Sequence, residues 1–463
     1  MAVQISSNTG SSGTSPLAGM TYWQRTFGCQ MNENDAERVA GMLDAAGARA
    51  VSTIEEADIA VFLTCCVRER ADIRLMGQVA SLKNVPPAHD APRIIAVGGC
   101  IGQRDGAELE RQLPNVDVVF GTHNLSHLPA LLEQRISTGR AVAETIEEND
   151  GFSSELPQHR ENPWHAWVPI MTGCDNFCTY CIVPYVRGRE RSRRIEDIAD
   201  ELSGLADQGI RELTLLGQNV NSYGRDLYGK PRFAEVLRLA GESGVDRVRF
   251  VTSHPKDLLP ETIEAMASYP NIMHQLHLSL QSGSDRILAA MNRKYDTARY
   301  LSLVDDLRSA MPDISLSTDI IVGFPGETEE DFQMTYDLVK EVSYGQVFTF
   351  IYSKRAGTPA AKMPDDTPHE VIQERFDRLV DLVQECAYRE NQKELAKTLD
   401  VLVEGVSKRD PNMLAGKSPK NQTVHAKLPE GVGIEELRGR IVKVEVTEAK
   451  TWYLQGKLVD EGK

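Results

Sequence analysis

The run Gly173-Cys174-Asp175-Asn176-Phe177-Cys178-Thr179-Tyr180-Cys181 is the most informative stretch of this chain. Its three cysteines, at spacings of four and three residues, allow one short loop to wrap three thiolates around a single metal site. A [4Fe–4S] cluster normally takes four thiolates. With only three nearby, one iron stays open, and an open coordination position is what reactive metal sites retain. The sequence therefore predicts a reactive iron–sulfur site in this loop.

A zinc site is the alternative interpretation of the same loop. Structural zinc would need a fourth Cys or His at matched spacing. After Cys181 the chain has neither until His254. This gap favours the iron–sulfur cluster.

Length and composition indicate an ordinary globular chain of two or three domains, because 463 residues exceed what one hydrophobic core supports. No apolar run approaches the ~20 residues of a membrane span, so no membrane partner is expected. Residues 1–20 are rich in Ser, Thr and Gly, lack the pattern of a secretory signal, and are expected to form a disordered tail. Eight cysteines without such a signal indicate a reducing cytoplasm and metal ligation rather than disulfides.

The charge pattern limits the partners that we expect. A net charge of −16 argues against a large non-specific nucleic-acid surface. A local basic run nevertheless follows the cysteine loop, with arginines at 187, 189, 191, 193 and 194. We expect phosphate or substrate contacts from Arg187, Arg189, Arg191 and Arg193. A solvated basic turn is the alternative.

Residues 21–136 alternate strand-like and helical runs, which predicts an open parallel α/β sheet followed by a linker over 137–160. The expected strands are Thr21–Thr26, Ile59–Leu63, Ile94–Val97 and Val116–Phe120, with helices at about 33–47, 69–83 and 124–135. Cys29, Cys65 and Cys100 each lie just after one of the first three strands. Ligands gather beyond the carboxyl ends of such strands, so these cysteines predict a second metal site.

Residues 161–397 repeat the strand–helix pattern six times, which predicts a partial (β/α)6 barrel with its chemistry at the strand carboxyl ends. The expected strands are Trp167–Met171, Glu212–Leu216, Val248–Val251, His274–Leu280, Ser315–Val322 and Gln346–Ile351. A long helix over about 369–396 follows them. Residues 398–463 change to short β runs and predict a small all-β barrel, a common oligonucleotide-binding architecture.

The motifs of the chain resemble, over roughly residues 20–460, the radical S-adenosylmethionine (SAM) methylthiotransferases of the MiaB type. The cysteine loop continues as Pro184 through Arg193 much as it does in that family, and the C-terminal barrel is similar to a TRAM domain. The other matching runs are Thr26–Asp35, Thr64–Glu69, Gly98–Cys100, Gly217–Val220, Ser253–Pro255, Gln281–Ser284, Asp319–Thr328 and Tyr352–Pro359.

The resemblance implies an enzyme with two [4Fe–4S] clusters and SAM. Cys174, Cys178 and Cys181 would hold the SAM-binding cluster, and Cys29, Cys65 and Cys100 the sulfur-donating one. Tyr180, Gln218, Ser253, Gln281 and Asp319 are then expected to contact SAM. The implied reaction converts N6-isopentenyladenosine at tRNA position 37 into its 2-methylthio form, with SAM as methyl donor and radical source. Implied partners are a tRNA anticodon stem-loop carrying isopentenyladenosine, an electron donor such as flavodoxin or ferredoxin, and a sulfur donor.

Two other functions stay open at this point. A sister methylthiotransferase would act on threonylcarbamoyl-adenosine in tRNA or on a ribosomal protein aspartate. A non-catalytic iron–sulfur RNA-binding or redox-sensing protein would need only the cysteines and the barrel.

The chain also departs from the family pattern. Leu63 replaces the usual Asn, Cys66 replaces a small residue and is expected to be a bystander, and Gly416–Asn421 replaces the usual turn of the C-terminal barrel. Cys386 is expected to be structural.

Overall fold

The computed structural model describes residues 15–65, 69–89, 91–147 and 151–459. The chain divides into two compact units, Met1–His159 and Arg160–Lys463. Among the described residues, no helix combines the length and apolarity that a membrane span needs.

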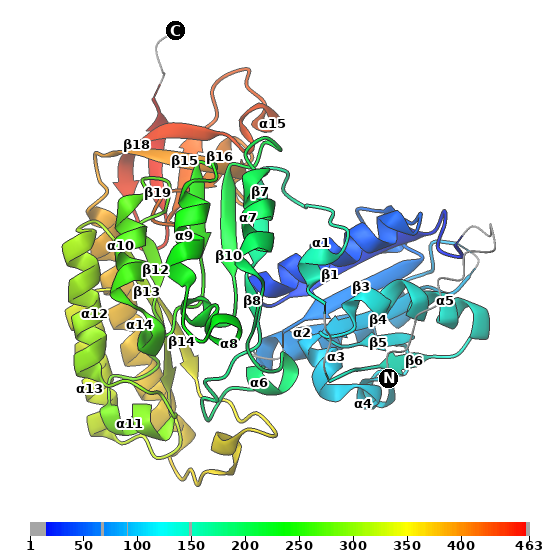
Figure 1. The fold of residues 1–463 in the computed structure, drawn as a ribbon, viewed down its shortest axis with the longest axis horizontal. Helices are drawn as coiled ribbons and strands as arrows, with labels where there is room; N and C mark the ends of the chain where they lie inside the picture. Colours follow the sequence, from blue (N-terminus) through cyan, green and yellow to red (C-terminus); the bar gives the residue numbers. More distant parts are fainter. Residues whose placement is uncertain (1–14, 66–68, 90, 148–150, 460–463) are drawn as a thin grey trace. The chain divides into compact units, whose positions relative to one another are not determined.

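The first unit is built on a six-stranded parallel sheet of order β2-β1-β3-β4-β5-β6 (Figure 1). Its strands are β1 (Thr21–Phe27), β2 (Arg49–Ala50), β3 (Ile59–Thr64), β4 (Ile94–Gly99), β5 (Val118–Phe120) and β6 (Val142–Glu144), and its helices are α1 (Gln30–Ala45), α2 (Glu69–Ser81), α3 (Cys100–Asp105), α4 (Ala107–Gln112) and α5 (Leu128–Thr138). The predicted open parallel sheet is confirmed. Strand β6 lies within the range predicted as linker.

Alternating side chains of the central strands explain why helices cover both faces of this sheet. In β3, Ile59, Val61 and Leu63 belong to one hydrophobic core, whereas Ala60 and Phe62 belong to another. Helices α1 and α5 close the first core, and α2, α3 and α4 close the second. A strand buried on both sides reads as a continuous apolar run, as this one does.

Residues 15–20 correct one expectation. They fall within the predicted disordered tail, yet Leu17 is fully buried in the first core and the Ser15 hydroxyl donates to Glu133 at 2.6 Å. Residues 1–14 lie outside the described part of the chain.

The second unit contains the predicted half-barrel. Its principal strands are β7 (His165–Pro169), β10 (Glu212–Leu216), β11 (Arg247–Phe250), β12 (Gln275–His277), β13 (Ser315–Val322) and β14 (Gln346–Ile351). They form two parallel three-stranded sheets, β11-β10-β7 and β12-β13-β14. Single bridges, Val248 to Ile272 and Ser253 to Leu278, connect the two sheets into one curved wall.

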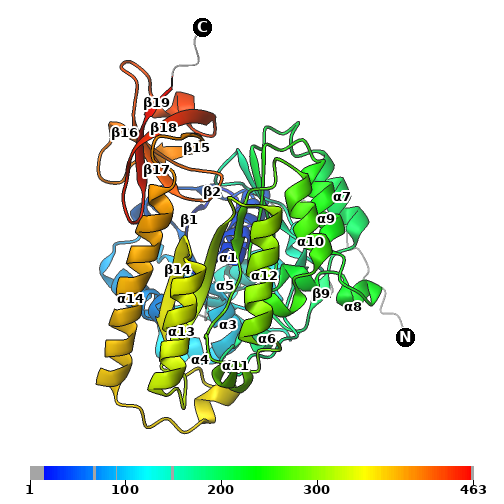
Figure 2. The same cartoon turned by 90° about the vertical axis from the view of Figure 1, so that its left-hand side faces the viewer.

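Helices cover the outside of this wall, as Figure 2 shows for α12, α13 and α14. The helices of this unit are α6 (Val183–Val186), α7 (Ile195–Ser203), α8 (Arg225–Tyr228), α9 (Phe233–Gly241), α10 (Pro260–Ser268), α11 (Asp285–Ala290), α12 (Thr297–Ala310), α13 (Glu329–Val342), α14 (His369–Gln392) and α15 (Ile434–Leu437). Every second strand residue, such as Leu276 and Leu278 near β12, joins the apolar core with these helices. The intervening side chains therefore face the inside of the half-barrel.

The chain ends in a closed five-stranded barrel of order β15-β16-β17-β19-β18, which confirms the predicted small β domain. Its strands are β15 (Thr398–Val406), β16 (Met413–Lys417), β17 (Thr423–Lys427), β18 (Ile441–Ala449) and β19 (Leu454–Leu458). Strand β16 was not predicted from the sequence.

Two buried arginines of β11 join this barrel to the half-barrel. Arg247 donates to the carbonyl oxygens of Lys417 and Asp400 at 2.8 and 2.6 Å. Arg249 donates to those of Ser418 and Pro419 at 2.9 and 3.1 Å. The turn that departs from the family pattern is thus a contact between domains, and its fully buried Ser418 is unavailable to RNA.

Candidate cluster and cofactor sites

The cysteine loop follows a short hairpin strand, β8 (Met171–Thr172), which pairs with β9 (Arg191–Ser192). Gly173 connects β8 to the cysteine loop and has φ of +80°. A Cβ at this position would lie 1.9 Å from the Arg189 carbonyl oxygen. Only glycine allows this close approach. The loop backbone is then held by the segment after α11, since Thr179 N donates to Met291 O at 3.0 Å and Asn292 Nδ2 to Phe177 O at 2.9 Å.

The three thiols of this loop lie close enough to influence one another. Burial, with a smaller contribution from the neighbouring thiols, raises the pKa of Cys174 to about 11 and that of Cys181 to about 12. Two donors face the sulfurs: Arg293 Nη1 lies 3.4 Å from Cys178 Sγ, and Asn176 Nδ2 lies 3.6 Å from Cys174 Sγ. Bound metal would replace the thiol protons, and these donors suit the resulting thiolates.

Within the described part of the chain, no three His, Cys, Asp or Glu side chains converge on a point that would hold a single ion. Thiols that do not converge on a single point are compatible with a cluster, because each thiolate of a [4Fe–4S] centre binds a different iron. They do not favour the zinc alternative, in which all ligands meet one ion.

The second trio comes from three neighbouring strands of the first unit. Cys65 directly follows β3, Cys100 begins α3 directly after β4, and Cys29 precedes α1 two residues after β1. Strand pairing aligns these ends, with Phe27 opposite Thr64 and Thr64 opposite Gly99. The predicted convergence on one sheet edge is therefore present in the backbone.

A glycine after β1 allows the chain to pass close to Cys65 at the end of β3. Gly28 has φ of +137°, and a Cβ there would lie 2.3 Å from Cys65 Cβ. Helices α1 and α3 both begin at this edge, and positive helix N-termini favour thiolates. The donor set fits a cluster held by Cys29, Cys65 and Cys100. Cys66 lies outside the described residues.

Two of the predicted SAM contacts meet at the ends of β10 and β11. Ser253 Oγ donates to Asn221 Oδ1 at 3.4 Å. Within the described chain, Gln218 Oε1 and Asn221 Nδ2 are buried without a hydrogen-bond partner. A buried acceptor and a buried donor that each lack a partner suit a ligand that carries an ammonium and a carboxylate, as SAM does. Asn221 was not singled out from the sequence, although it follows the Gly217–Val220 motif directly.

The other predicted contacts lie elsewhere along the strands. Half-buried Tyr180 packs against the apolar group that includes Ile287 and Met291. Its contact with SAM stays a prediction. Gln281 N donates to the Asp319 carbonyl at 2.8 Å. Asp319 itself is in the middle of β13, below the strand end.

The arginine run separates into two kinds of residue. Arg193 is buried, forms an ion pair with Glu201 at 2.6 Å and donates to the Pro169 carbonyl at 2.8 Å, so its contacts assign it to the fold rather than to a substrate. Arg187 is also buried. Arg191 is half-buried. Arg189 is exposed, 3.0 Å from Asp175 and with its guanidinium 5.1 Å from the Phe177 ring centre. Of the four predicted contacts, Arg189 is the most accessible.

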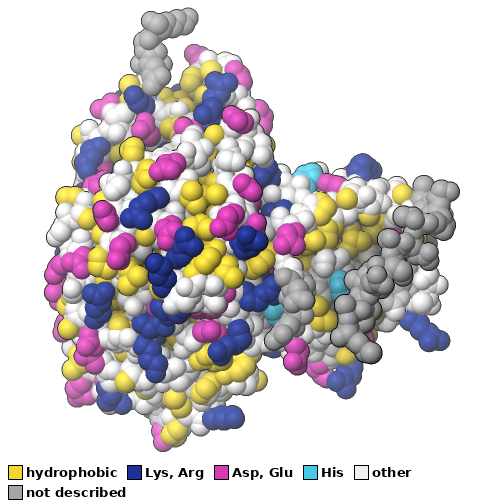
Figure 3. Space-filling view, in the orientation of Figure 1, with side chains coloured by type: hydrophobic (Ala, Val, Ile, Leu, Met, Phe, Trp, Pro, Cys, Tyr) yellow, Lys and Arg dark blue, Asp and Glu magenta, His cyan; other side chains and the backbone are white. Residues whose placement is uncertain are grey.

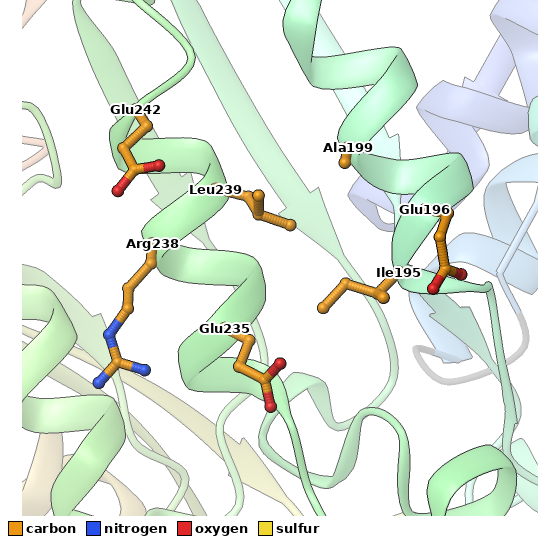
Figure 4. Close-up of a pocket in the computed structure, with 7 residues that line it drawn as sticks. All are labelled: Ile195, Glu196, Ala199, Glu235, Arg238, Leu239 and Glu242. Atoms are coloured by element: carbon orange, nitrogen blue, oxygen red, sulfur yellow. The ribbon is translucent and has the colours of Figure 1, made fainter.

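The surface adds little to this site. On the face in Figure 3, basic and acidic side chains are interspersed rather than gathered by sign. Figure 4 shows an open groove between α7 and α9, on the outer helices. Its lining residues are Ile195, Glu196, Ala199, Glu235, Arg238, Leu239 and Glu242. None of the candidate residues lines this groove.

Comparison with known proteins gives the same division of the chain. Residues 21–121, 168–339 and 392–459 match, in turn, the family models described as Uncharacterized protein family UPF0004, Radical SAM superfamily and TRAM domain. The half-barrel and its three-cysteine loop define a radical SAM enzyme. More particularly, the chain belongs to the family of the tRNA-2-methylthio-N(6)-dimethylallyladenosine synthases, the name carried by its relatives.

These relatives are similar over almost their full length. The protein of Thermoanaerobacter sp. (strain X514) is 46% identical over 95% of this chain and 93% of its own. The protein of Acidothermus cellulolyticus is 48% identical over 94% of this chain and 88% of its own length. The protein of Mycobacteroides abscessus is 47% identical over 98% of this chain and 90% of its own length.

A solved structure shares the fold. The radical SAM methyltransferase TsrM from Kitasatospora setae, with cobalamin and a [4Fe–4S] cluster bound, covers 74% of this chain and 74% of its own at a TM-score of 0.52 and 12% identity. The predicted family, fold and cofactors are confirmed: the chain uses SAM with [4Fe–4S] clusters, two in its family.

Proposed function

We propose that this chain converts N6-isopentenyladenosine at position 37 of tRNA into 2-methylthio-N6-isopentenyladenosine. The observation that carries the proposal is the second cysteine trio, Cys29, Cys65 and Cys100, on the edge of a sheet separate from the radical loop. Radical generation needs only Cys174, Cys178 and Cys181. A second set of ligands supplies a place for the sulfur that a methylthio group requires.

The reaction needs cofactors because carbon 2 of adenine has neither a leaving group nor an acidic hydrogen. The bound clusters and SAM supply the radical, the methyl group and the sulfur. The chain holds and orients them. Cys174, Cys178 and Cys181 would hold the cluster that binds SAM, and Gln218 Oε1 and Asn221 Nδ2 suit the ammonium and carboxylate of SAM.

The adenine base of the substrate must leave the base stack of the RNA to reach such a site. A tRNA anticodon loop can present a splayed base, which is how sequence-specific RNA readers obtain access. Exposed Arg189 beside the loop is available to a phosphate. The partners of the reaction include a one-electron donor such as flavodoxin or ferredoxin and a sulfur donor. Cytoplasmic location follows from the tRNA substrate and from cysteines that must stay reduced.

The test combines two measurements. Reduced, iron-reconstituted protein should form 5′-deoxyadenosine from SAM and should place a methylthio group on isopentenyladenosine RNA, as detected by nucleoside mass analysis. Formation of 5′-deoxyadenosine with modification only of threonylcarbamoyl-adenosine or of a ribosomal protein would identify a sister enzyme instead. Absence of 5′-deoxyadenosine from cluster-loaded protein would identify a non-catalytic iron–sulfur protein.

A further inference from the structure

The inside of the half-barrel is unusually polar along β12 and β13. Leu316 and Ile320 of β13 join the helix-facing core, so Ser317 and Asp319 face inward. In the same way, the core position of Leu276 and Leu278 turns His277 inward. We call Gln275, His277, Ser279, Ser317 and Asp319 the inner polar row. Closed barrels of this kind normally fill this space with layers of branched apolar residues.

Hydrogen bonds connect the row from end to end. Gln275 Nε2 lies 3.4 Å from Ser317 Oγ, which lies 3.1 Å from His277 Nδ1. His277 Nε2 lies 3.1 Å from Asp319 Oδ2, and the Ser279 hydroxyl donates to the same oxygen at 3.3 Å. Because a carboxylate only accepts, Nε2–H donates to Asp319. The network fixes the orientation of Asp319.

One acceptor of the row remains available. Asp319 Oδ1 has no hydrogen-bond partner among the described residues, and the Asp319 side chain is 28% exposed beside His277 at 18%. A purely structural ion pair would be expected to satisfy both carboxylate oxygens or to lie at the surface. Here a positioned acceptor faces the inside of a half-barrel.

Aromatic side chains accompany this acceptor. The Phe348 ring of β14 lies edge-on to His277 with ring centres 5.9 Å apart. On β7, Ala166 and Val168 join the core, so half-buried Trp167 faces inward. Flat apolar surfaces together with a few fixed polar groups are how proteins bind a nucleobase removed from its stack.

We propose that the inner polar row binds the purine of the substrate, with Asp319 accepting the N6–H of the modified adenine and Phe348 contacting its ring. This rests on the proposed function, which it makes more specific. It reassigns Asp319 from SAM, the ligand predicted from sequence, to the nucleobase. N6-isopentenyladenine carries one exocyclic N–H, so a single fixed acceptor matches it.

The experiment measures binding of two RNA stem-loops to cluster-loaded protein. One carries N6-isopentenyladenosine, and the other carries N6-methyl-N6-isopentenyladenosine, which lacks the N6–H. The wild-type protein should bind the first at least tenfold more tightly. Asp319→Asn should weaken binding of the first RNA about 10- to 100-fold, the usual value of a hydrogen bond to a charged group, and should remove the preference between the two.

The matched control is a second His–Asp pair of the same unit. His274 Nδ1 lies 2.7 Å from Asp313 Oδ1 on the surface, with Asp313 59% exposed. Asp313→Asn should leave both dissociation constants as in the wild type. His277→Gln, which keeps a polar side chain but misplaces Asp319, should weaken RNA binding less than Asp319→Asn does.

The remaining outcomes overturn the proposal in separable ways. If Asp319→Asn behaves like Asp313→Asn while the wild-type protein modifies isopentenyladenosine RNA, the row is structural and the proposed function stands. If Asp319→Asn weakens binding of SAM but not of RNA, the row belongs to SAM. If the wild-type protein modifies no isopentenyladenosine RNA, the proposed function fails and the base assignment with it.

Discussion

The cysteines of the two trios are brought together in opposite ways. Cys174, Cys178 and Cys181 lie within eight consecutive residues, so one loop brings them together. Cys29, Cys65 and Cys100 are separated by dozens of residues and meet only because β1, β3 and β4 pair in register. The first set is a property of local sequence, and the second is a property of the fold.

This difference decides what each site depends on. Closing a short loop costs little chain entropy, whereas bringing distant segments together depends on the pairing and burial of a whole sheet. The distributed trio should therefore be the more sensitive of the two to changes in packing. The local trio should be the more sensitive to its immediate hydrogen-bond donors.

Replacement of a single cysteine in either trio should give the largest effect. It tests most directly whether the two trios act separately. Cys174→Ala should abolish 5′-deoxyadenosine formation, with a loss well beyond the roughly 100-fold that removal of a supporting side chain costs. Cys65→Ala should retain SAM cleavage but stop methylthiolation. Iron content and both products are measured, with Cys386→Ala on α14 as the control. Loss of SAM cleavage in Cys65→Ala would show that the two sites are not separable.

Crowding the sheet edge tests the dependence of the distributed trio on packing. Gly28→Ala would place a Cβ 2.3 Å from Cys65 Cβ, and overpacking of this kind costs about 1–3 kcal/mol. Gly139→Ala is the control, because Gly139 also has positive φ, +67°, but nothing lies within 4 Å of its Cβ position. We expect Gly28→Ala to lower the melting temperature further than Gly139→Ala does and to lose about half of the bound iron. Equal behaviour of the two variants would contradict the role given to Gly28.

A pH series tests a buried carboxyl group of the second unit. Burial raises the pKa of Glu327 from its usual 4.5 to about 7, so the folded second unit favours the protonated acid. Its stabilising effect is complete below pH 4.5 and is lost as the pH rises through 7, by up to about 3 kcal/mol at ~1.4 kcal/mol per pKa unit. Denaturant unfolding between pH 4.5 and 8 should reveal this loss, and Glu327→Gln should lack it. An unchanged pH slope in that variant would assign the effect to another group.

The smallest expected effect concerns the donor to the local trio. Arg293→Gln removes the guanidinium from Cys178 Sγ and should make the loop cluster harder to reduce, because a hydrogen-bonded cation stabilises the added negative charge. We expect the reduced state to be disfavoured about tenfold, a shift of about 59 mV in a redox titration followed by electron paramagnetic resonance. Arg389→Gln is the matched control, since Arg389 Nη2 lies 3.4 Å from Cys386 Sγ. A potential that is equal in both variants would remove this role from Arg293.

Much of the fold was predictable because its strands have strong apolar patterns. Glu212–Leu216, Ser315–Val322 and Gln346–Ile351 begin and end where predicted. The strands that were missed are short or weakly apolar. Val142–Glu144 is a three-residue edge strand, and Met413–Lys417 contains Gly416, so pairing with neighbours rather than intrinsic propensity places them in sheets.

The site was predictable where chemistry depends on local spacing and less so elsewhere. Both cysteine trios were predicted from their positions in the chain, and strand pairing aligns the ends that carry Cys29, Cys65 and Cys100. His277 was missed, although His274–Leu280 alternates polar residues with Leu276, Leu278 and Leu280 and so marks a strand with a polar inner face. The burial of Arg193 was not foreseen, because a charge run does not reveal which of its members point into the fold.

The arginine contacts of the C-terminal barrel have an evolutionary consequence. Within the barrel, Arg247 and Arg249 bind backbone carbonyls of Asp400 and of the Lys417–Pro419 turn, and every residue type has a carbonyl. Arg249 also pairs with Glu212 of the half-barrel at 2.9 Å. Mutations in the turn can therefore accumulate without loosening the domain junction, which explains how Gly416–Asn421 could drift from the family pattern. Besides the two arginines, Lys420 is constrained by its ion pair with buried Glu394 at 2.8 Å. A chimera that exchanges the barrel between relatives should tolerate a foreign turn sequence provided that both arginines and Lys420 are kept.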